Sequence, residues 1–500
     1  MTRKLLLFAV SLLAGAWSSL ATVQPHALFT DGCVLQRDAN IPVWGKANAE
    51  EIVTVEFCGQ RITVRAHPDG KWIVYLKKLA AGGPYKMVIR GENTITLTNV
   101  FIGEVWVCSG QSNMHFMLKT AENANQVIPA AHDAQLHLFT VPMVTADTPQ
   151  TSVEAKWEVC DPTNVPTFTA VGYFFGRDLR KALGVPIGLI HTSWGGTPAE
   201  AWTDSATLQN NPALHSVVER YAGLHKDYDP VKAQEMHVKA MERYKQLAAK
   251  AKAAGTTPPR RPKAPQDPTK GPKRLSVLYN AMIAPLQPYA IRGAIWYQGE
   301  ANAHYAKEYQ TLFPAMIGGW RKTWGQGDFP FFFVQIAPFQ GQPPEIREAQ
   351  LIAWQKTKNT AMAVSVDHGN PNNIHPTAKE PIGQLLALAA RALTYGEKIE
   401  YSGPIFKNMK IEDAKAILSF THIGSGLEAK GGALKGFTMA AAGSTNFVPA
   451  SATIVDDTVV VQSVEIKKPG AVRYGWANVP DVNLFNKEGL PASPFRTDVE

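Results

Sequence analysis

The spacing of apolar residues changes twice along this 500-residue chain. In the first part, over about 22–99, every second residue of several short runs is apolar, which is typical of strands with one buried face. These runs include Val53, Val55 and Phe57, then Trp72, Val74 and Leu76. Turn sequences such as Pro68-Asp69-Gly70 separate the runs. The pattern therefore predicts a small antiparallel β-sandwich over 22–99.

Over residues 100–395 the pattern becomes one of apolar strands that alternate with helices. Strands are expected at 105–108, 187–190, 294–297, 331–336 and 361–366, and helices at 173–183, 346–356 and 378–393. This alternation is typical of a parallel sheet covered on both faces by helices. The sequence thus predicts an α/β fold, a three-layer α/β/α domain. Short apolar runs return over 396–500, where we expect a second β region.

The N-terminus has the order of features that marks a secretory signal peptide. Arg3 and Lys4 precede an apolar run over 5–17, and the small residues Ser19 and Ala21 follow it. We interpret residues 1–21 as this signal and expect an exported protein, periplasmic or secreted. Later stretches fall short of 18 uninterrupted apolar residues, so we expect no membrane span.

Export would place the four cysteines in an oxidising compartment, and we expect Cys33 and Cys58 to be the best candidates for a pair. The cysteines show no CxxC spacing, and the histidines show no helical metal-binding pair. We therefore expect neither a metal site nor a cofactor.

The formal charge of +8 is concentrated in one segment. Residues 219–274 contain 14 Lys and Arg against 6 Asp and Glu, a surplus equal to that of the whole chain. A basic segment can bind nucleic acid. In an exported protein we interpret it instead as a solvated helical insertion, over about 205–275, and expect no nucleic-acid partner.

Polar clusters follow four of the predicted strands. They occupy 110–113, 193–196, 298–302 and 367–375. Ligands of parallel sheets bind beyond the carboxyl ends of the strands. We therefore expect these four segments, although distant in the sequence, to meet at one edge of the sheet.

The residue types in these segments suit nucleophilic acyl transfer. That reaction needs a hydroxyl, an imidazole that takes its proton, and N–H donors for the developing oxyanion. Ser112 and His375 can supply the first two. Gly195 and Gly196 allow a backbone N–H to approach closely, and the side-chain amides of Gln298 and Asn302 offer a further donor.

Longer stretches around these residues carry a resemblance to a known family. They read VWVCSGQSNM from 105, IGLIHTSWGGTPAEAW from 187, AIWYQGEAN from 294 and IHP from 374. The chain resembles the SGNH-hydrolase superfamily, and most closely the sialate O-acetylesterase family of carbohydrate esterases. The resemblance implies hydrolysis of O-acetyl esters on sugars, sialic acids in particular, without a cofactor.

By this resemblance Ser112 would be the nucleophile and His375 the general base. Gly195 or Gly196 would donate to the oxyanion, together with Gln298 or, as a second candidate, Asn302. Three residues, Gln111, Asn113 and Glu300, would lie behind the reacting groups and orient them.

One position departs from the superfamily pattern. An Asp commonly stands three residues before the catalytic His, and related sequences often carry one two residues before. This chain has Asn372 and Asn373 at these positions. Three explanations stay open: a Ser-His dyad whose imidazole is held by a backbone carbonyl, a distant acid such as Asp367, or an inactive relative.

Other functions compete with sialate O-deacetylation. An acetylxylan esterase, or an esterase for another acetylated carbohydrate, would need the same Ser and His. A glycosidase would need two carboxyl groups, for which Glu300 and Asp367 are candidates. A glycan-binding protein without catalysis is suggested by the two β regions and the 12 tryptophans.

Overall fold

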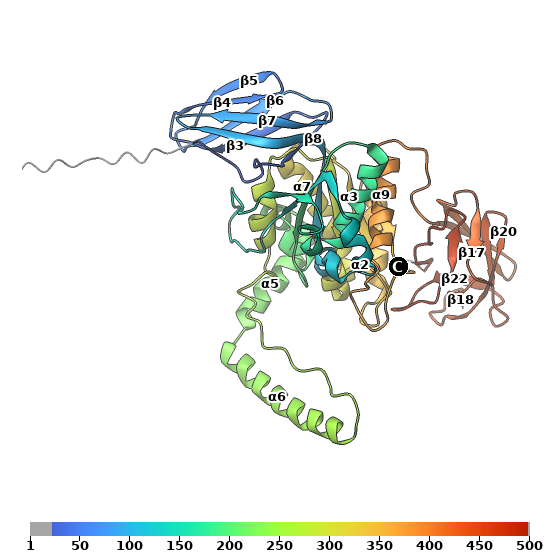
Figure 1. The fold of residues 1–500 in the computed structure, drawn as a ribbon. Coiled ribbons are helices and arrows are strands. Elements are labelled where there is room, and N and C mark those ends of the chain that lie inside the picture. The colour runs from blue at the N-terminus through green and yellow to red at the C-terminus, as the bar shows by residue number, and fades with distance from the viewer. Residues whose placement is uncertain (1–22, 499–500) are drawn as a thin grey trace, which may run out of the picture.

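The computed structural model describes residues 23–498. A β-sandwich at the N-terminal end, a central α/β body and a C-terminal β region follow one another, and one long helix, α6, projects from the central body (Figure 1). The expected signal peptide over 1–21 lies outside the described residues, so export stays a prediction.

The N-terminal region forms two packed layers of strands. One layer contains β1 (Gln24–Pro25), β3 (Ile41–Lys46) and β6 (Lys71–Leu76); the other contains β2 (Val34–Gln36), β4 (Ile52–Phe57), β5 (Gln60–Arg65), β7 (Gly82–Arg90) and the first part of β8 (Thr94–Gly110). In β6 the apolar residues Trp72, Val74 and Leu76 are buried, whereas Lys71 and Tyr75 are exposed. The period of two therefore indicated the buried face correctly.

Strand β8 belongs to both the sandwich and the central body. Its first half pairs with β7, and its second half lies between β11 (Ile187–Ser193) and β12 (Gly293–Tyr297). The boundary that we expected between residues 99 and 100 falls inside this 17-residue strand. The two regions are thus joined by continuous backbone pairing rather than by a loop.

The central sheet has the strand order β10-β9-β11-β8-β12-β13-β14. Its further strands are β9 (Asp133–Thr140), β10 (Trp157–Cys160), β13 (Phe331–Gln335) and β14 (Thr360–Val364). Neighbours from β9 to β14 run parallel, as predicted, but the edge strand β10 pairs antiparallel with β9. The sheet is therefore mixed, because this short edge strand lies beside the outermost parallel strand in the opposite direction.

Two pairs of helices pack against the central sheet. Helix α3 (Ala170–Leu183) contacts α9 (Glu380–Leu393), and α7 (Ala306–Trp324) contacts α8 (Pro344–Lys356). Figure 1 shows α3 and α9 side by side. The side chain of Thr169 caps α3 by accepting from the Gly172 N–H, and Gly184 ends this helix in a left-handed conformation. Helix α7, which contains Pro314, was not predicted from the sequence.

The C-terminal region has its own apolar core. One sheet contains β15 (Ile405–Glu412), β16 (Lys415–Thr421), β20 (Ser451–Val455) and β21 (Thr458–Gln462); a second contains β18 (Phe437–Ala441), β19 (Val448–Pro449), β22 (Pro469–Tyr474) and β24 (Phe495–Arg496). Strands β17 (Leu427–Ala429) and β23 (Leu484–Asn486) pair separately. The expected second β region is confirmed.

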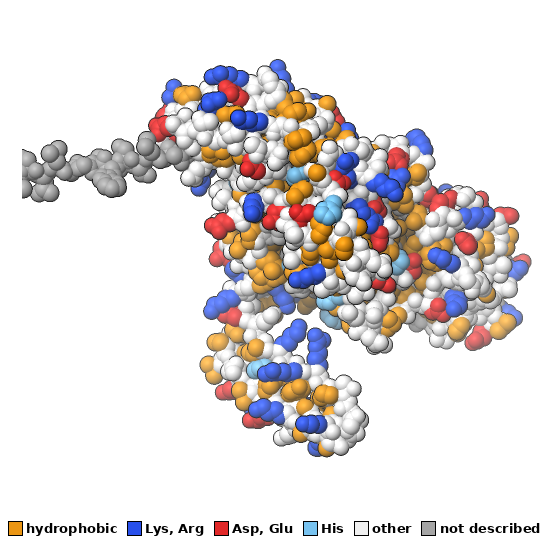
Figure 2. Space-filling view, in the orientation of Figure 1, with side chains coloured by type: hydrophobic (Ala, Val, Ile, Leu, Met, Phe, Trp, Pro, Cys, Tyr) orange, Lys and Arg blue, Asp and Glu red, His pale blue; other side chains and the backbone are white. Residues whose placement is uncertain are grey.

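The expected insertion over about 205–275 contains helices α4 (Ser205–Asn210), α5 (His215–Asp227) and α6 (Pro230–Ala253). Helix α6 buries none of its residues, and Lys and Arg side chains are spread over its surface (Figure 2). Over 23–498 the structure contains no helix that is long and apolar enough to cross a membrane.

The expected pairing of Cys33 with Cys58 is wrong. All four cysteines, each of which lies within the described part of the chain, are free. Cys33 is buried, whereas Cys58 is exposed in the turn after β4. One thiol therefore lies inside the protein and the other at its surface.

Candidate active site

The end of strand β8 presents Ser112 at the edge of the central sheet. Ser112 is the first residue of α1 (Ser112–His115), two residues after Gly110. Gly110 has a φ of 138°, and a Cβ at this position would lie 2.2 Å from the Tyr297 carbonyl oxygen. A residue without a side chain is required at this turn. The Gln111 N–H then donates to the same carbonyl at 2.9 Å.

The hydroxyl of Ser112 contacts the imidazole of His375, which follows the last strand of the sheet. Ser112 Oγ and His375 Nε2 are 2.7 Å apart, and both residues are half-buried. Burial, together with the nearby charge of Lys379, lowers the pKa of His375. The imidazole is therefore neutral at neutral pH and can accept the proton of the hydroxyl.

The structure does not bring Asp367 to His375. Asp367 Oδ2 lies 3.6 Å from Nε2 of His368 instead. The chain turns at Asn370, whose side-chain oxygen accepts from the N–H groups of Asn372 and Asn373. We attribute the separation of Asp367 from His375 to this turn. Asp367, the distant acid considered as a partner of His375, thus makes no contact with it in this structure.

The Nδ1 atom of His375 has no hydrogen-bond acceptor within residues 23–498, neither a carboxylate nor a backbone carbonyl. What holds this residue is its backbone, since the His375 N–H donates to Asn373 Oδ1 at 3.0 Å. The geometry is that of a Ser-His pair.

Two backbone N–H groups are available beside the hydroxyl. The N–H of Ser112, at the start of α1, and the N–H of Gly195 have no hydrogen-bond partner in the described structure. A Cβ on Gly195 would lie 3.4 Å from the Cβ of Ser112, so the two segments approach closely. Gly196 has a φ of 72°, a left-handed conformation that favours glycine. Gly195 and Gly196 are both exposed. These donors suit an oxyanion that forms on a carbonyl at Ser112.

Gln298 and Asn302 do not provide the further donor that we expected. Both side chains are buried. The Gln298 amide donates to the Thr197 carbonyl at 3.3 Å and to Asn302 Oδ1 at 2.7 Å, which uses both of its N–H groups. The Asn302 amide donates to Glu200 Oε2 at 2.8 Å. Gln298 and Asn302 thus connect residues 298–302 to residues 197–200, because a buried amide must find its hydrogen-bond partners inside the protein.

A buried network lies behind the reacting pair and is centred on Asn113. Its Nδ2 donates to Glu300 Oε1 at 2.6 Å and to the Ile374 carbonyl at 3.0 Å. Asn113 thus connects the Ser112 helix to the His375 segment. Burial raises the pKa of Glu300, whose Oε2 has no hydrogen-bond partner among the described residues. Gln111 Oε1 accepts from the Ala301 N–H at 3.1 Å. This hydrogen bond connects the polar segment 110–113 to the segment 298–302.

Lys379 completes this network and was missed by the sequence analysis. Its Nζ donates to Asn113 Oδ1 at 2.5 Å, and its side chain is 1% exposed. Burial lowers the pKa of Lys379 to about 7. Nζ also lies 4.8 Å from the ring centroid of Phe116 and 5.3 Å from that of Tyr297. The only sequence signal was its position four residues after His375, where a lysine near a helix start is ordinarily a surface residue.

Among residues 23–498, no group of three or more His, Cys, Asp and Glu side chains is arranged to hold a metal ion.

Comparison with known proteins gives consistent results. The model of a family described as "Carbohydrate esterase, sialic acid-specific acetylesterase" matches residues 269–392. A sialate O-acetylesterase from Rattus norvegicus is 31% identical over 92% of this chain and 92% of its own length. The sialate O-acetylesterase from Mus musculus is 32% identical over 78% of this chain and 77% of its own length.

A solved structure extends the comparison to the fold. The crystal structure of a carbohydrate acetylesterase from Xanthomonas citri has a TM-score of 0.81 and 38% sequence identity, and the match covers 96% of this chain and 100% of that one. Full-length similarity in sequence and fold, with esterase-type residues at the end of β8, leads to one assignment. The chain belongs to the sialate O-acetylesterase family of carbohydrate esterases.

Proposed function

We propose that this esterase removes O-acetyl groups from sialic acids by acyl transfer through Ser112 and His375. The observation that carries the proposal is the distance of 2.7 Å between Ser112 Oγ and His375 Nε2. A neutral imidazole at this distance can take the proton of the hydroxyl, which makes the oxygen a nucleophile.

The first half of the reaction forms an acetyl-enzyme. Ser112 Oγ attacks the acetyl carbonyl carbon while its proton moves to His375 Nε2. The N–H groups of Ser112 and Gly195 donate to the oxyanion of the tetrahedral intermediate. The intermediate collapses, the ester C–O bond breaks, and the imidazolium returns the proton to the departing sugar oxygen.

Water releases the acetyl group in the second half. His375 takes a proton from a water molecule, whose oxygen attacks the acetyl carbon. The bond to Ser112 Oγ breaks, the proton returns to Oγ, and acetic acid leaves as acetate and a proton. A Ser-His pair suffices in this scheme, because two hydrogen bonds position the imidazole. The His375 N–H donates to Asn373 Oδ1, and Asn113 Nδ2 donates to the carbonyl of the preceding residue, Ile374.

The names of the curated relatives support sialic acid as the sugar, whereas the Xanthomonas citri protein is named for carbohydrates in general. Acetylated xylan is therefore the second candidate substrate. We also propose that residues 1–21 direct export to the periplasm or the medium. N-terminal sequencing of the mature protein should then begin near Thr22.

The test compares the wild type with Ser112→Ala and with the exposed control Ser451→Ala. Each protein is assayed for acetate release from 4-nitrophenyl acetate, from O-acetylated sialosides and from acetylated xylo-oligosaccharides. We expect Ser112→Ala to lose at least about 10³-fold in kcat and Ser451→Ala to match the wild type. Equal rates for Ser112→Ala and the wild type would refute the mechanism, and preferential cleavage of the xylo-oligosaccharides would refute the choice of sugar.

A further inference from the structure

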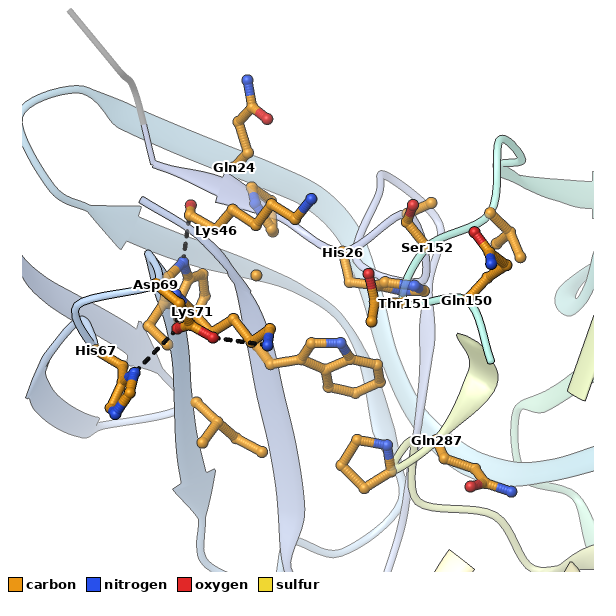
Figure 3. Close-up of a pocket in the computed structure, with 18 of the residues that line it drawn as sticks. Gln24, His26, Lys46, His67, Asp69, Lys71, Gln150, Thr151, Ser152 and Gln287 are labelled. Carbon is orange, nitrogen blue, oxygen red and sulfur yellow. Dashed lines mark hydrogen bonds and ion pairs between the residues drawn. The ribbon is translucent and has the colours of Figure 1, made fainter. Parts of the chain in front are cut away.

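A cavity of about 860 Å³ lies between the N-terminal sandwich and the central body. Its walls come from β1, β3, β5 and β6 on one side, and from residues 150–153 and 284–288 on the other (Figure 3). We call it the sandwich cavity. It is separate from the esterase site, since neither Ser112 nor His375 lines it. Its volume lies in the range of small-molecule binding sites.

One wall of the sandwich cavity is apolar and aromatic. Its lining includes Trp44, Val64, Trp72, Ile73 and Pro288. Trp44 is held rigidly, because it stacks on His26 with ring centroids 5.0 Å apart and contacts Phe29 edge to face at 4.9 Å. It nevertheless stays partly exposed. A fixed, flat apolar side chain with polar neighbours suits the C–H face of a sugar ring.

The rim of the sandwich cavity is cationic. Lys46 is exposed, and its ammonium has neither a carboxylate nor another hydrogen-bond partner within the described chain. Figure 3 shows its side chain extending over the cavity toward the side where His26 and Ser152 lie. The carboxylate in the lining, Asp69, is already paired with Lys71 at 2.7 Å. The unpaired charge at the rim is therefore positive and suits an anion.

The cavity lining also contains a buried donor that lacks a partner. His26 is 6% exposed and its Nδ1 accepts from the Leu28 N–H at 3.2 Å, so that the proton of the neutral ring lies on Nε2. This Nε2 has no hydrogen-bond partner within residues 23–498. Thr151 and Ser152, whose hydroxyls are exposed and likewise without protein partners, lie on the same side of the cavity (Figure 3). A buried donor left unpaired is unfavourable, and an acceptor atom on a ligand would relieve this cost.

We propose that the sandwich cavity binds an acidic oligosaccharide, with a sugar ring on Trp44 and a carboxylate at Lys46. The hydroxyls of the sugar would bond to His26, Thr151 and Ser152. The site would hold a carboxylate-bearing glycan on the enzyme independently of ester cleavage. This inference goes beyond the proposed function, because it requires neither Ser112 nor His375.

The test measures binding of glycans that carry no acetyl ester, so its result does not depend on the esterase activity. The probes are tetrameric α2,8-linked N-acetylneuraminic acid, tetragalacturonic acid and neutral xylotetraose, titrated by isothermal calorimetry. We expect both acidic probes to bind, and to bind several-fold more weakly when NaCl rises from 0.05 to 0.5 M, because salt screens the ion pair. Xylotetraose should bind at least tenfold more weakly than either.

The variant is Lys46→Glu, and its matched control is Lys86→Glu, which makes the same charge change at an exposed position of β7 outside the cavity. Both sites are exposed, so both variants should fold, which thermal unfolding checks. We expect Lys46→Glu to lose at least tenfold in affinity for the acidic probes and Lys86→Glu to match the wild type. The proposal is overturned if neither acidic probe binds, if xylotetraose binds as tightly, or if the two variants lose affinity equally.

Discussion

Replacing Lys379 with Met tests whether a buried charge lies beneath the proposed catalytic pair. Burial lowers the pKa of Lys379 from 10.5 to about 7. Because a tenfold change in proton affinity corresponds to about 1.4 kcal/mol, holding the ammonium in this site costs about 5 kcal/mol relative to water. Methionine has a similar length and no charge, so Lys379→Met avoids this cost.

Two losses oppose that gain. Asn113 Oδ1 loses the donor that lies at 2.5 Å in the wild type, and Glu300 loses the nearby positive charge. Each loss costs about 1–3 kcal/mol. The difference in stability at a single pH is therefore small, and its change with pH is the informative quantity.

The sign of that change follows from proton binding. Above pH 7 the folded protein releases the proton of Lys379, whereas the unfolded chain keeps it up to about 10.5. The unfolded state thus binds more protons, and the stability of the wild type rises with pH in this window. The Met variant lacks this rise. Its unfolding free energy minus that of the wild type should fall by about 3 kcal/mol between pH 6 and pH 9.

Urea unfolding followed by tryptophan fluorescence at pH 6, 7, 8 and 9 measures this difference. The control Lys86→Met removes an exposed lysine, and its difference from the wild type should stay constant with pH. A Lys379→Met difference that is equally constant, or that grows with pH, would show that the charge is not buried as described.

Three further predictions concern activity against 4-nitrophenyl acetate. Lys379→Met should move the acidic limb of the kcat/KM profile to higher pH, since the ammonium lowers the pKa of His375; an unmoved limb would contradict this coupling. Asp367→Asn should keep most of the activity, because Asp367 faces His368, and a loss of about 10³-fold would instead identify it as the partner of His375. Asn113→Ala should lower kcat about tenfold or more and reduce the melting temperature, because it removes hydrogen bonds to two charged groups and to the Ile374 carbonyl; an unchanged kcat and melting temperature would exclude this positioning role.

Much of the fold could be predicted from the sequence, because the spacing of apolar residues indicates directly which side chains are buried. The alternation in β6 and the apolar runs at β8, β11 and β12 indicated strands in the right places. Helix α7 escaped prediction because Pro314 and the pair Gly318-Gly319 weaken its helical pattern, yet the packing of its buried face overrides these local preferences. The boundary that we expected between residues 99 and 100 falls inside strand β8. The sequence did not reveal this continuity, because the pairing partners that decide where a strand ends lie far away in the sequence.

The roles of polar residues were harder to predict than their location. Gln298 and Glu300 lie two residues apart after the same strand, yet one joins two loops and the other bonds to Asn113. The position of Lys379 four residues after His375 did not reveal its burial, because a lysine is ordinarily solvated and only the surrounding chain removes water from it.

The sequence by itself determined the order of strands and helices, the four polar segments and the residues Ser112 and His375, because periodicity and motif spacing are local properties. Tertiary structure alone decided that these two side chains meet, that Asp367 turns elsewhere, and that Lys379 is buried beneath them. Contacts between residues hundreds of positions apart depend on how the sheet brings its strand ends together, and the desolvation that shifts a pKa exists only once that packing is complete.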